Sequence, residues 1–276
     1  MHLIIQGGDI ATRDLKHLAK LSGASRIERI TPEAFRLCDA HASDDIAASC
    51  ERARLDYAFV PETRRLADFR LLAMDMDSTL ITIETVDELA DMVGFKPEVA
   101  AITAQAMRGE IEYDESLERR VALLEGLDEG ALDRVYDERL KLSPGAERLL
   151  ATARRAGIRI LLISGGFTRI TERLQARLGL DHTHANTLEV DGGKLTGRLL
   201  GRTVNADAKR DELVRVRDAS GIQRGQIIAI GDGANDLRFM AEAGVSVAYH
   251  AKPIVRSAAT HALDYVGLDG VLNLFD

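Results

Sequence analysis

The stretch LLAMDMDSTL, residues 71–80, joins an apolar run directly to two carboxylates, Asp75 and Asp77. The run shows no alternation of apolar and polar residues, which is typical of a strand that is covered on both faces in a parallel sheet. The two carboxylates cannot turn into the core, because burying unpaired charge is costly. Ligands bind at the carboxyl ends of the strands in such sheets. A helix cap or a turn is the alternative explanation, since Asp, Ser and Thr also favour those positions.

The rest of the chain extends the same pattern. Further apolar runs occupy residues 158–164, 226–232 and 245–249. Amphipathic stretches lie between them, such as PGAERLLATARRAG, in which we expect Pro144 to open a helix and Gly157 to close it. Strands alternating with helices at this spacing predict a doubly wound α/β fold with a parallel sheet.

Two segments depart from this alternation. Residues 84–142 read as four helices with no strand among them, which predicts a helical cap inserted into a core of residues 69–83 and 143–276. Residues 1–68 form a small βαβ-like α+β unit of their own. Within the core, Asp-Gly-Gly in residues 189–200 indicates a β-hairpin.

Composition narrows the class of protein. The 276 residues are 46% hydrophobic and 29% charged, which excludes a chain that is disordered throughout. The net charge of -8 disfavours nucleic acid and anionic membranes as partners. Cys38 and Cys50 form neither a disulfide framework nor a zinc pattern. No signal peptide and no apolar run of about 18 residues is present, so we expect a cytoplasmic protein.

A second acidic cluster follows another apolar run. Asp232 and Asp236 belong to GDGAND, directly after IIAI. If the two strands are parallel neighbours, Asp75, Asp77 and Asp232 meet at one edge of the sheet, where they repel one another unless a cation compensates. Oxygen ligands without nearby His or Cys favour Mg²⁺. GDGAND lacks the last glycine of a dinucleotide-binding motif, and no phosphate-binding P-loop motif is present.

A third strand end carries Ser164, Gly165 and Gly166 before a helical stretch. A hydroxyl and backbone N–H groups at a helix N-terminus can bind an anion, although a plain glycine turn explains the same residues. Lys209, taken alone, is one surface lysine among many. Together, these residues supply two carboxylates, a magnesium site, a phosphate cradle and a cation.

In this order, DMDST, ISGG, Lys209 and GDGAND resemble the four motifs of the haloacid dehalogenase superfamily of phosphotransferases. More narrowly, residues from about 70 to 272 resemble the phosphoserine phosphatase family through DMDSTLITIETVDELA, AMRGEIEYDESLERRV, LSPGA, ISGGF and GDGANDLRFMAEAGVSVAYHAKP. The first 68 residues lie where bacterial members carry ACT-like regulatory modules, but they show no ligand motif.

The resemblance implies a role for each motif. Asp75 would be the nucleophile, and Asp77 would protonate the leaving oxygen and then activate water. Mg²⁺ would be held by Asp75, the backbone carbonyl of Asp77 and Asp232, with Asp236 supporting it through water. The remaining positions would bind the phosphoryl group or support the site: Ser164, Gly165, Lys209 and Asn235 as substrate-binding residues, and Thr79 as a supporting residue.

Substrate selection would fall to the cap. By the resemblance, Glu84 would bind the substrate ammonium and Arg120 its carboxylate, which an arginine can grip with two hydrogen bonds. Met107 and Tyr113 would line the apolar side of the pocket. The residues alone favour solvated helix charges, and nothing in the spacing selects Arg120 over Arg119.

The function that the resemblance implies is a Mg²⁺-dependent hydrolysis of O-phosphoserine through an aspartyl-phosphate, the last step of serine biosynthesis. Two alternatives stay open: a phosphatase for another small phosphomonoester, such as phosphothreonine or phosphohomoserine, and an amino-acid sensor whose catalysis has lapsed. Intact Asp75, Asp77, Lys209 and Asp232 argue against the sensor. A homodimer is left open.

Overall fold

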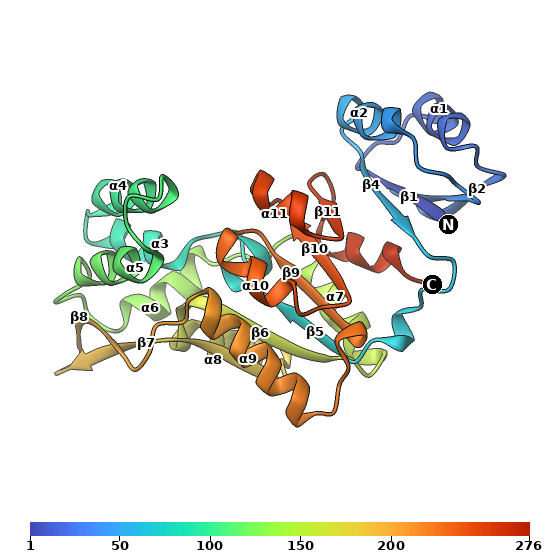
Figure 1. Ribbon diagram of the computed structural model, residues 1–276. Coiled ribbons are helices and arrows are strands. Elements are labelled where there is room, and N and C mark those ends of the chain that lie inside the picture. The colour runs from blue at the N-terminus through green and yellow to red at the C-terminus, as the bar shows by residue number, and fades with distance from the viewer.

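A seven-stranded sheet forms the centre of the computed structural model, which describes residues 1–276 (Figure 1). The strands lie in the order β11-β10-β9-β5-β6-β7-β8. All neighbouring pairs are parallel except β7 and β8. This sheet confirms the predicted α/β core. The bounds are β5 (Leu71–Met74), β6 (Arg159–Phe167), β7 (His182–Asp191), β8 (Lys194–Leu200), β9 (Ile227–Gly231), β10 (Val245–Tyr249) and β11 (His261–Leu263).

Helices cover both faces of the sheet, which is why its strands are apolar without alternation. In β5, Leu72 and Met74 share a core with α7 and α8, whereas Leu71 and Ala73 share another with α9, α10 and α11. The helices are α7 (Ala146–Arg155), α8 (Thr168–Leu178), α9 (Ala206–Ala219), α10 (Leu237–Met240) and α11 (Pro253–Ala258).

The cap is an insertion between β5 and β6. Its helices are α3 (Thr85–Met92), α4 (Lys96–Met107), α5 (Tyr113–Ala122) and α6 (Ala131–Arg134), which continues as a further turn to Arg139. The two crossings between core and cap lie side by side, because Ile81 and Leu142 form an antiparallel bridge. The chain therefore enters and leaves the cap at one point.

The β7–β8 hairpin extends from the sheet to the cap, and it confirms the predicted turn, with Gly192 and Gly193 both at positive φ. Leu195 exchanges backbone hydrogen bonds with the segment after α5, accepting from Gly126 N and donating to Leu127 O, each at 2.8 Å. The hairpin thus supports the outer side of the cap.

The N-terminal module has the element order β1 (His2–Gln6), α1 (Thr12–Ser22), β2 (Arg26–Thr31), β3 (Ala34–Cys38), α2 (Asp44–Ala53) and β4 (Asp56–Val60). Its sheet has the order β2-β3-β1-β4, and all its pairs are antiparallel. This βαββαβ arrangement is ferredoxin-like. It contains one strand, β3, that the sequence did not predict.

The module lies at the opposite end of the molecule from the cap (Figure 1). One face of its sheet packs on α1 and α2, and the other contributes Ile4, Ala58 and Val60 to the core of the catalytic part. The carboxylate of Asp56 accepts hydrogen bonds from the backbone N–H groups of residues 264–266, at 2.7, 2.9 and 3.1 Å. The module is therefore anchored on the C-terminal segment.

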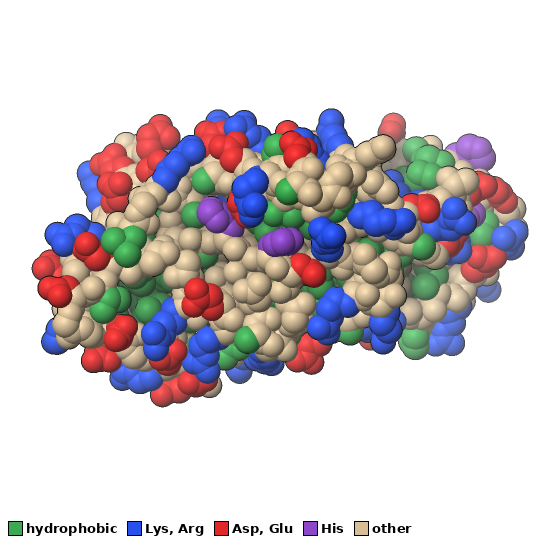
Figure 2. Space-filling view, turned by 90° about the horizontal axis from the view of Figure 1, so that it is seen from below, with side chains coloured by type: hydrophobic (Ala, Val, Ile, Leu, Met, Phe, Trp, Pro, Cys, Tyr) green, Lys and Arg blue, Asp and Glu red, His purple; other side chains and the backbone are tan.

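The surface is mixed in charge. Figure 2 shows acidic and basic side chains interspersed over the face that it presents. No helix of the chain combines the length and the apolar character that a membrane crossing requires.

Candidate active site

A cavity of about 720 Å³ lies between the carboxyl ends of the central strands and the cap. Asp75, Asp77 and Asp232 line it from the core, while Tyr113 and Arg120 line it from α5 of the cap. The strand ends that carry the aspartates and the helices of the cap therefore enclose the same cavity.

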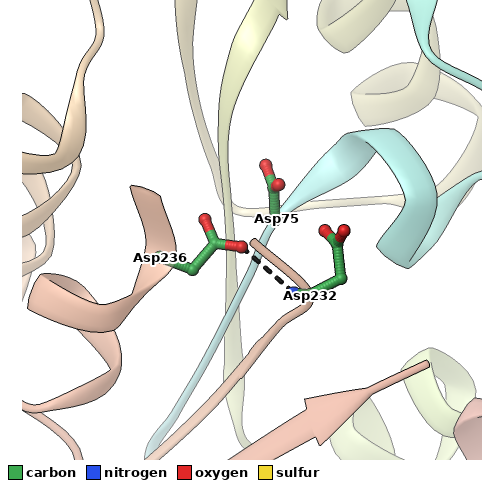
Figure 3. A group of neighbouring side chains, drawn as sticks. All are labelled: Asp75, Asp232 and Asp236. Carbon is green, nitrogen blue, oxygen red and sulfur yellow. Dashed lines mark hydrogen bonds between the residues drawn. The ribbon is translucent and has the colours of Figure 1, made fainter. Parts of the chain in front are cut away.

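Three carboxylates, those of Asp75, Asp232 and Asp236, lie close together at the ends of these strands (Figure 3). Asp75 follows β5 and Asp232 follows β9, and these strands are parallel neighbours in register through Met74 and Ile230. One carboxylate oxygen from each of Asp75, Asp232 and Asp236 lies within 4.8 Å of the others. An all-oxygen set of this kind suits a hard divalent cation such as Mg²⁺.

Lys209 is the cation of this cluster. Its side chain is fully buried, and its Nζ donates to Oδ1 of Asp75 at 2.7 Å and to Oδ1 of Asp236 at 2.8 Å. The second oxygen of Asp236 accepts from the backbone N–H groups of Asp232 and Gly233, at 3.1 and 3.0 Å. Both oxygens of Asp236 are thus engaged within the protein, whereas Oδ2 of Asp75 accepts no hydrogen bond from the chain.

The charges in the cluster are unbalanced. Burial, followed by the carboxylate of Asp236, raises the pKa of Asp75 well above its usual range, although Lys209 opposes the shift. Burial also raises the pKa of Asp232 to about 7. Burial would lower the pKa of Lys209, but the carboxylates of Asp236 and Asp75 outweigh it and raise the pKa. Three carboxylates against one ammonium leave a negative excess, which a divalent cation would offset.

Asp77 reaches the same cavity from a tight turn, Met76–Leu80, in which Ser78 adopts a positive φ of 57°. Its Oδ2 accepts from the hydroxyl of Thr85 at 3.1 Å, and its Oδ1 accepts from the Thr85 backbone N–H at 3.4 Å. Burial, followed by the charges of Glu84 and Asp75, raises the pKa of Asp77 well above its usual range. Burial therefore favours the protonated form of Asp77, which is the form that acts as a general acid.

The carboxyl end of β6, which includes Gly165 and Gly166, passes close beneath the cap. A Cβ on Gly165 would displace the Tyr113 hydroxyl, and one on Gly166 would lie 2.9 Å from Oδ2 of Asp77, so a larger residue at either position would disturb the side chains of the site. Ser164 is fully buried behind them, and its Oγ accepts from the Gly166 N–H at 2.8 Å. The Ser164 hydroxyl thus supports the end of β6 without lining the cavity itself.

Buried polar side chains hold the end of β6 and the acidic cluster in place. Asn186 donates to the Gly165 carbonyl and accepts from the Val204 N–H, both at 2.8 Å. Thr79, also fully buried, donates to Oδ1 of Asp232 at 3.3 Å. Asn235 lines the cavity beside Asp232.

The cap resolves which arginine faces the cavity. Arg120 lines it and is 9% exposed, whereas Arg119 lies outside and pairs with Glu115 at 2.5 Å. Glu84 also lines the cavity, where it accepts from Ser78 Oγ at 2.7 Å, and burial raises its pKa. On the cap side, the cavity therefore holds one guanidinium and three carboxylates, since Asp87 and Glu112 line it as well.

Met107 and Tyr113 complete the predicted cap residues, and both line the cavity. Met107 is 66% exposed, which places it at the rim. Burial raises the pKa of the Tyr113 phenol to about 12, so this hydroxyl stays protonated over Gly165.

Sequence reasoning missed several polar residues of the cavity wall, among them Asn205, Arg238 and Lys252. Asn205 caps α9, since its Oδ1 accepts from the N–H groups of Asp207 and Ala208 at 3.1 Å. An Asn directly before a helical stretch is an N-cap signal, so the sequence contained a clue to it. No local sequence signal indicates that Arg238 and Lys252 line a cavity, because only the tertiary fold brings them there.

Comparisons with known proteins agree with this geometry. A family model described as haloacid dehalogenase-like hydrolase matches residues 72–241, and a domain of unknown function (DUF4072) matches residues 3–46. A phosphoserine phosphatase of Albidiferax ferrireducens is 52% identical over 216 residues, covering 76% of this chain and 91% of that protein.

Solved structures are similar over the catalytic part and beyond it. A probable phosphoserine phosphatase from Vibrio cholerae, in its unliganded form, has a TM-score of 0.86 at 35% identity, covering 99% of this chain and 85% of that chain. A substrate-bound phosphoserine phosphatase complex has a TM-score of 0.71 at 34% identity, covering 75% of this chain and 99% of that chain.

Proposed function

The chain belongs to the haloacid dehalogenase-like hydrolases and, within them, to the phosphoserine phosphatase family, and from this premise we propose that it hydrolyses O-phosphoserine to serine and inorganic phosphate. One observation carries the choice of substrate. The cavity that holds Asp75 also holds Glu84 and the buried Arg120, which forms no salt bridge within the chain. A buried guanidinium without a carboxylate partner, in the same cavity as the Glu84 carboxylate, matches an amino acid's carboxylate and ammonium.

The proposed cofactor is Mg²⁺. Its ligands would be the carboxylates of Asp75 and Asp232 and the backbone carbonyl of Asp77. Asp236 would act indirectly, because its oxygens already accept hydrogen bonds from Lys209, Asp232 and Gly233. When bound, the ion would neutralise phosphoryl charge and fix the orientation of the phosphate.

In the first step, a carboxylate oxygen of Asp75 attacks phosphorus, and the bond between phosphorus and the serine oxygen breaks. Asp77 gives its proton to that oxygen, and serine leaves. The raised pKa of Asp77, caused first by burial, keeps this proton available. Thr85 holds the Asp77 carboxyl in position through two contacts.

In the second step, Asp77 takes a proton from water as the water oxygen attacks phosphorus. The bond between phosphorus and Asp75 breaks, which releases inorganic phosphate and restores the Asp75 carboxylate. Lys209 contacts Asp75 and would stabilise the charge of the transferring group. Gly165 and Asn235 would bind the phosphoryl oxygens, with Ser164 supporting the end of β6.

Substrate recognition is assigned to the cap. Arg120 would bind the carboxylate and Glu84 the ammonium, while Met107 and Tyr113 would contact the apolar carbons. We further propose the cytoplasm as the location and the last step of serine biosynthesis as the role. The domain boundaries proposed are 1–68 for the N-terminal module, 69–83 with 143–276 for the core, and 84–142 for the cap.

Phosphate release measured with Mg²⁺ tests this function. We expect kcat/KM for phosphoserine to exceed that for phosphothreonine and for phosphoethanolamine by at least tenfold. A preference for another phosphomonoester would reassign the substrate within the family. Absence of turnover on all three, with phosphoserine still bound, would favour the sensor instead.

A further inference from the structure

Two hydroxyl groups in the cap wall have no partner in the protein. Ser116 Oγ and Thr103 Oγ1 are buried atoms that make no hydrogen bond, and both residues line the cavity. Ser116 comes from α5 and Thr103 from α4, two helices that pack against each other. Ser116 lies within the stretch AMRGEIEYDESLERRV, but the sequence motifs assign a role to neither residue.

The state of Ser116 is unusual for a helical serine. Such a hydroxyl commonly bonds back to the carbonyl one turn earlier. In α5, the Ser116 backbone N–H donates to the Glu112 carbonyl at 2.9 Å, but the hydroxyl does not share that acceptor. The residue is only 1% exposed, so water at the surface does not satisfy it either. Because a buried polar group without a partner is costly, a function that supplies the partner is the simplest explanation.

The neighbour of Ser116 indicates what that partner is. Arg120 lies one helical turn later on the same face of α5, and its Nε donates to the Ser116 carbonyl at 3.2 Å. This bond ties the guanidinium to the backbone of Ser116 and leaves its other N–H groups without a carboxylate. A hydroxyl near a positive charge turns its oxygen toward the cation and its hydrogen away, so it can donate to an anion that the cation also binds. The pair is therefore complementary to an anion with two oxygens.

We propose that Ser116 and Thr103 complete the carboxylate subsite of this enzyme, by donating their hydroxyl hydrogens to the substrate carboxylate that Arg120 binds, after a shift of α4 and α5 that uncovers the two buried oxygen atoms. The assignment rests on the proposed function and makes these residues specificity determinants. They are not catalytic residues, since the reacting groups Asp75 and Lys209 belong to the strand ends and the core.

Three substrates distinguish an effect on carboxylate binding from an effect on phosphoryl transfer. Phosphoserine has both the carboxylate and the ammonium, phosphoethanolamine lacks the carboxylate, and 3-(phosphonooxy)propanoate lacks the ammonium. Ser116→Ala should raise KM about tenfold for phosphoserine and for 3-(phosphonooxy)propanoate, the two substrates that carry a carboxylate. This rise corresponds to about 1.4 kcal/mol. We expect kcat to change by less than about twofold, and both constants for phosphoethanolamine to stay within the same margin.

Thr103 offers a matched pair of variants. Thr103→Val removes the hydroxyl at constant shape and should raise KM for the two carboxylates, whereas Thr103→Ser keeps the hydroxyl and should behave like the wild type. Thermal unfolding provides a readout that a structural role would move. Because Ser116 Oγ has no partner in the free protein, Ser116→Ala should not lower Tm.

The outcomes distinguish the subsite from the function. If the wild type prefers phosphoserine to phosphoethanolamine but Ser116→Ala and Thr103→Val leave that ratio unchanged, the subsite is overturned and the function stands. An equal rise of KM on all three substrates also overturns the subsite, because it indicates a general effect on the cap. If the wild type shows no preference for phosphoserine, the proposed function fails and the subsite fails with it.

Discussion

Asn205 Nδ2 donates a hydrogen bond of 3.0 Å to Oδ2 of Asp114, and this contact joins the N-terminus of α9 to the cap helix α5. The same Asn205 side chain caps α9, which carries Lys209 one turn later. The amide group of Asn205 therefore links the helical cap, through Asp114, to the helix that positions the buried Lys209.

Asn205→Asp should separate these two roles. A carboxylate can still cap the helix, but it repels Asp114, so we expect KM for phosphoserine to rise several-fold with little loss of stability. Asn205→Ala should also remove the N-cap hydrogen bonds of α9, which should lower the free energy of unfolding by about 0.5–2 kcal/mol. Steady-state kinetics and urea unfolding of both variants provide the measurement. Equal KM values for Asn205→Asp and the wild type would show that the contact does not affect substrate binding.

Asp75→Asn should abolish turnover while the protein stays folded. The amide has nearly the shape of the carboxylate but lacks its nucleophilic charge. Phosphate release and circular dichroism together test this expectation. If the variant kept a tenth of wild-type kcat, another residue would have to be the nucleophile.

Removal of divalent metal with EDTA should stop activity, and Mg²⁺ should restore it where Ca²⁺ does not. Ca²⁺ takes more ligands in looser geometry, so it could engage both oxygens of Asp75 and block attack. The assay is phosphate release after dialysis against each ion. Full activity with Ca²⁺ alone would contradict this explanation.

Arg120→Ala should raise KM for phosphoserine steeply and leave p-nitrophenyl phosphate turnover nearly intact, because the aryl phosphate has no carboxylate. Losing a desolvated charge contact costs roughly 2–5 kcal/mol, or on the order of 30- to several-thousand-fold in kcat/KM. Arg119→Ala is the matched control, since Arg119 pairs with Glu115 outside the cavity and is 50% exposed. Glu84→Gln should show the same selectivity as Arg120→Ala, with a smaller loss. Losses of equal size on both substrates would assign Arg120 to folding or cap closure.

His261 should make a contribution to stability that is lost as the pH drops from 7 to 5. Arg64 Nη1 lies 2.7 Å from His261 Nε2, and since arginine only donates, the ring must accept and stay neutral. Burial, followed by the Arg64 charge, lowers the pKa of His261 from 6.5 to about 4. Between these values, the unfolded chain binds a proton that the folded protein does not, which costs about 2 kcal/mol at pH 5.

Urea unfolding of the wild type and of His261→Gln at pH 7 and pH 5 isolates this contribution. Glutamine can accept from Arg64 but does not titrate, so the variant should lose about 2 kcal/mol less than the wild type over this range. The same loss in both proteins would place the pH dependence on other groups.

Much of the core site could be predicted from the sequence because its signals are local. An unbroken apolar run indicates a strand covered on both faces, and the residues directly after it must then lie at the carboxyl edge of a parallel sheet. This argument alone brought Asp75 next to Asp232, since β5 and β9 proved to be neighbours. The metal ligands and the acid–base role of Asp77 stay predictions.

What could not be predicted depends on contacts between distant residues. The choice of Arg120 over Arg119 is set by how α5 is rotated over the cavity. The helix that Pro144 was expected to open begins at Ala146 instead, because Gly145 takes a left-handed turn at φ 78°. A Cβ on Gly145 would collide with Asp269, which lies more than a hundred residues away in the sequence.

The anchoring of the N-terminal module has a consequence for synthesis on the ribosome. The module emerges first, but Asp56 meets its backbone partner at residue 264, which is 208 positions later in the chain. Until that segment emerges, one face of the module's sheet, with Ile4, Ala58 and Val60, lacks its covering layer. An incomplete chain therefore exposes an apolar surface that is prone to aggregation. A chaperone that binds nascent chains would bind this surface before the phosphatase site has formed.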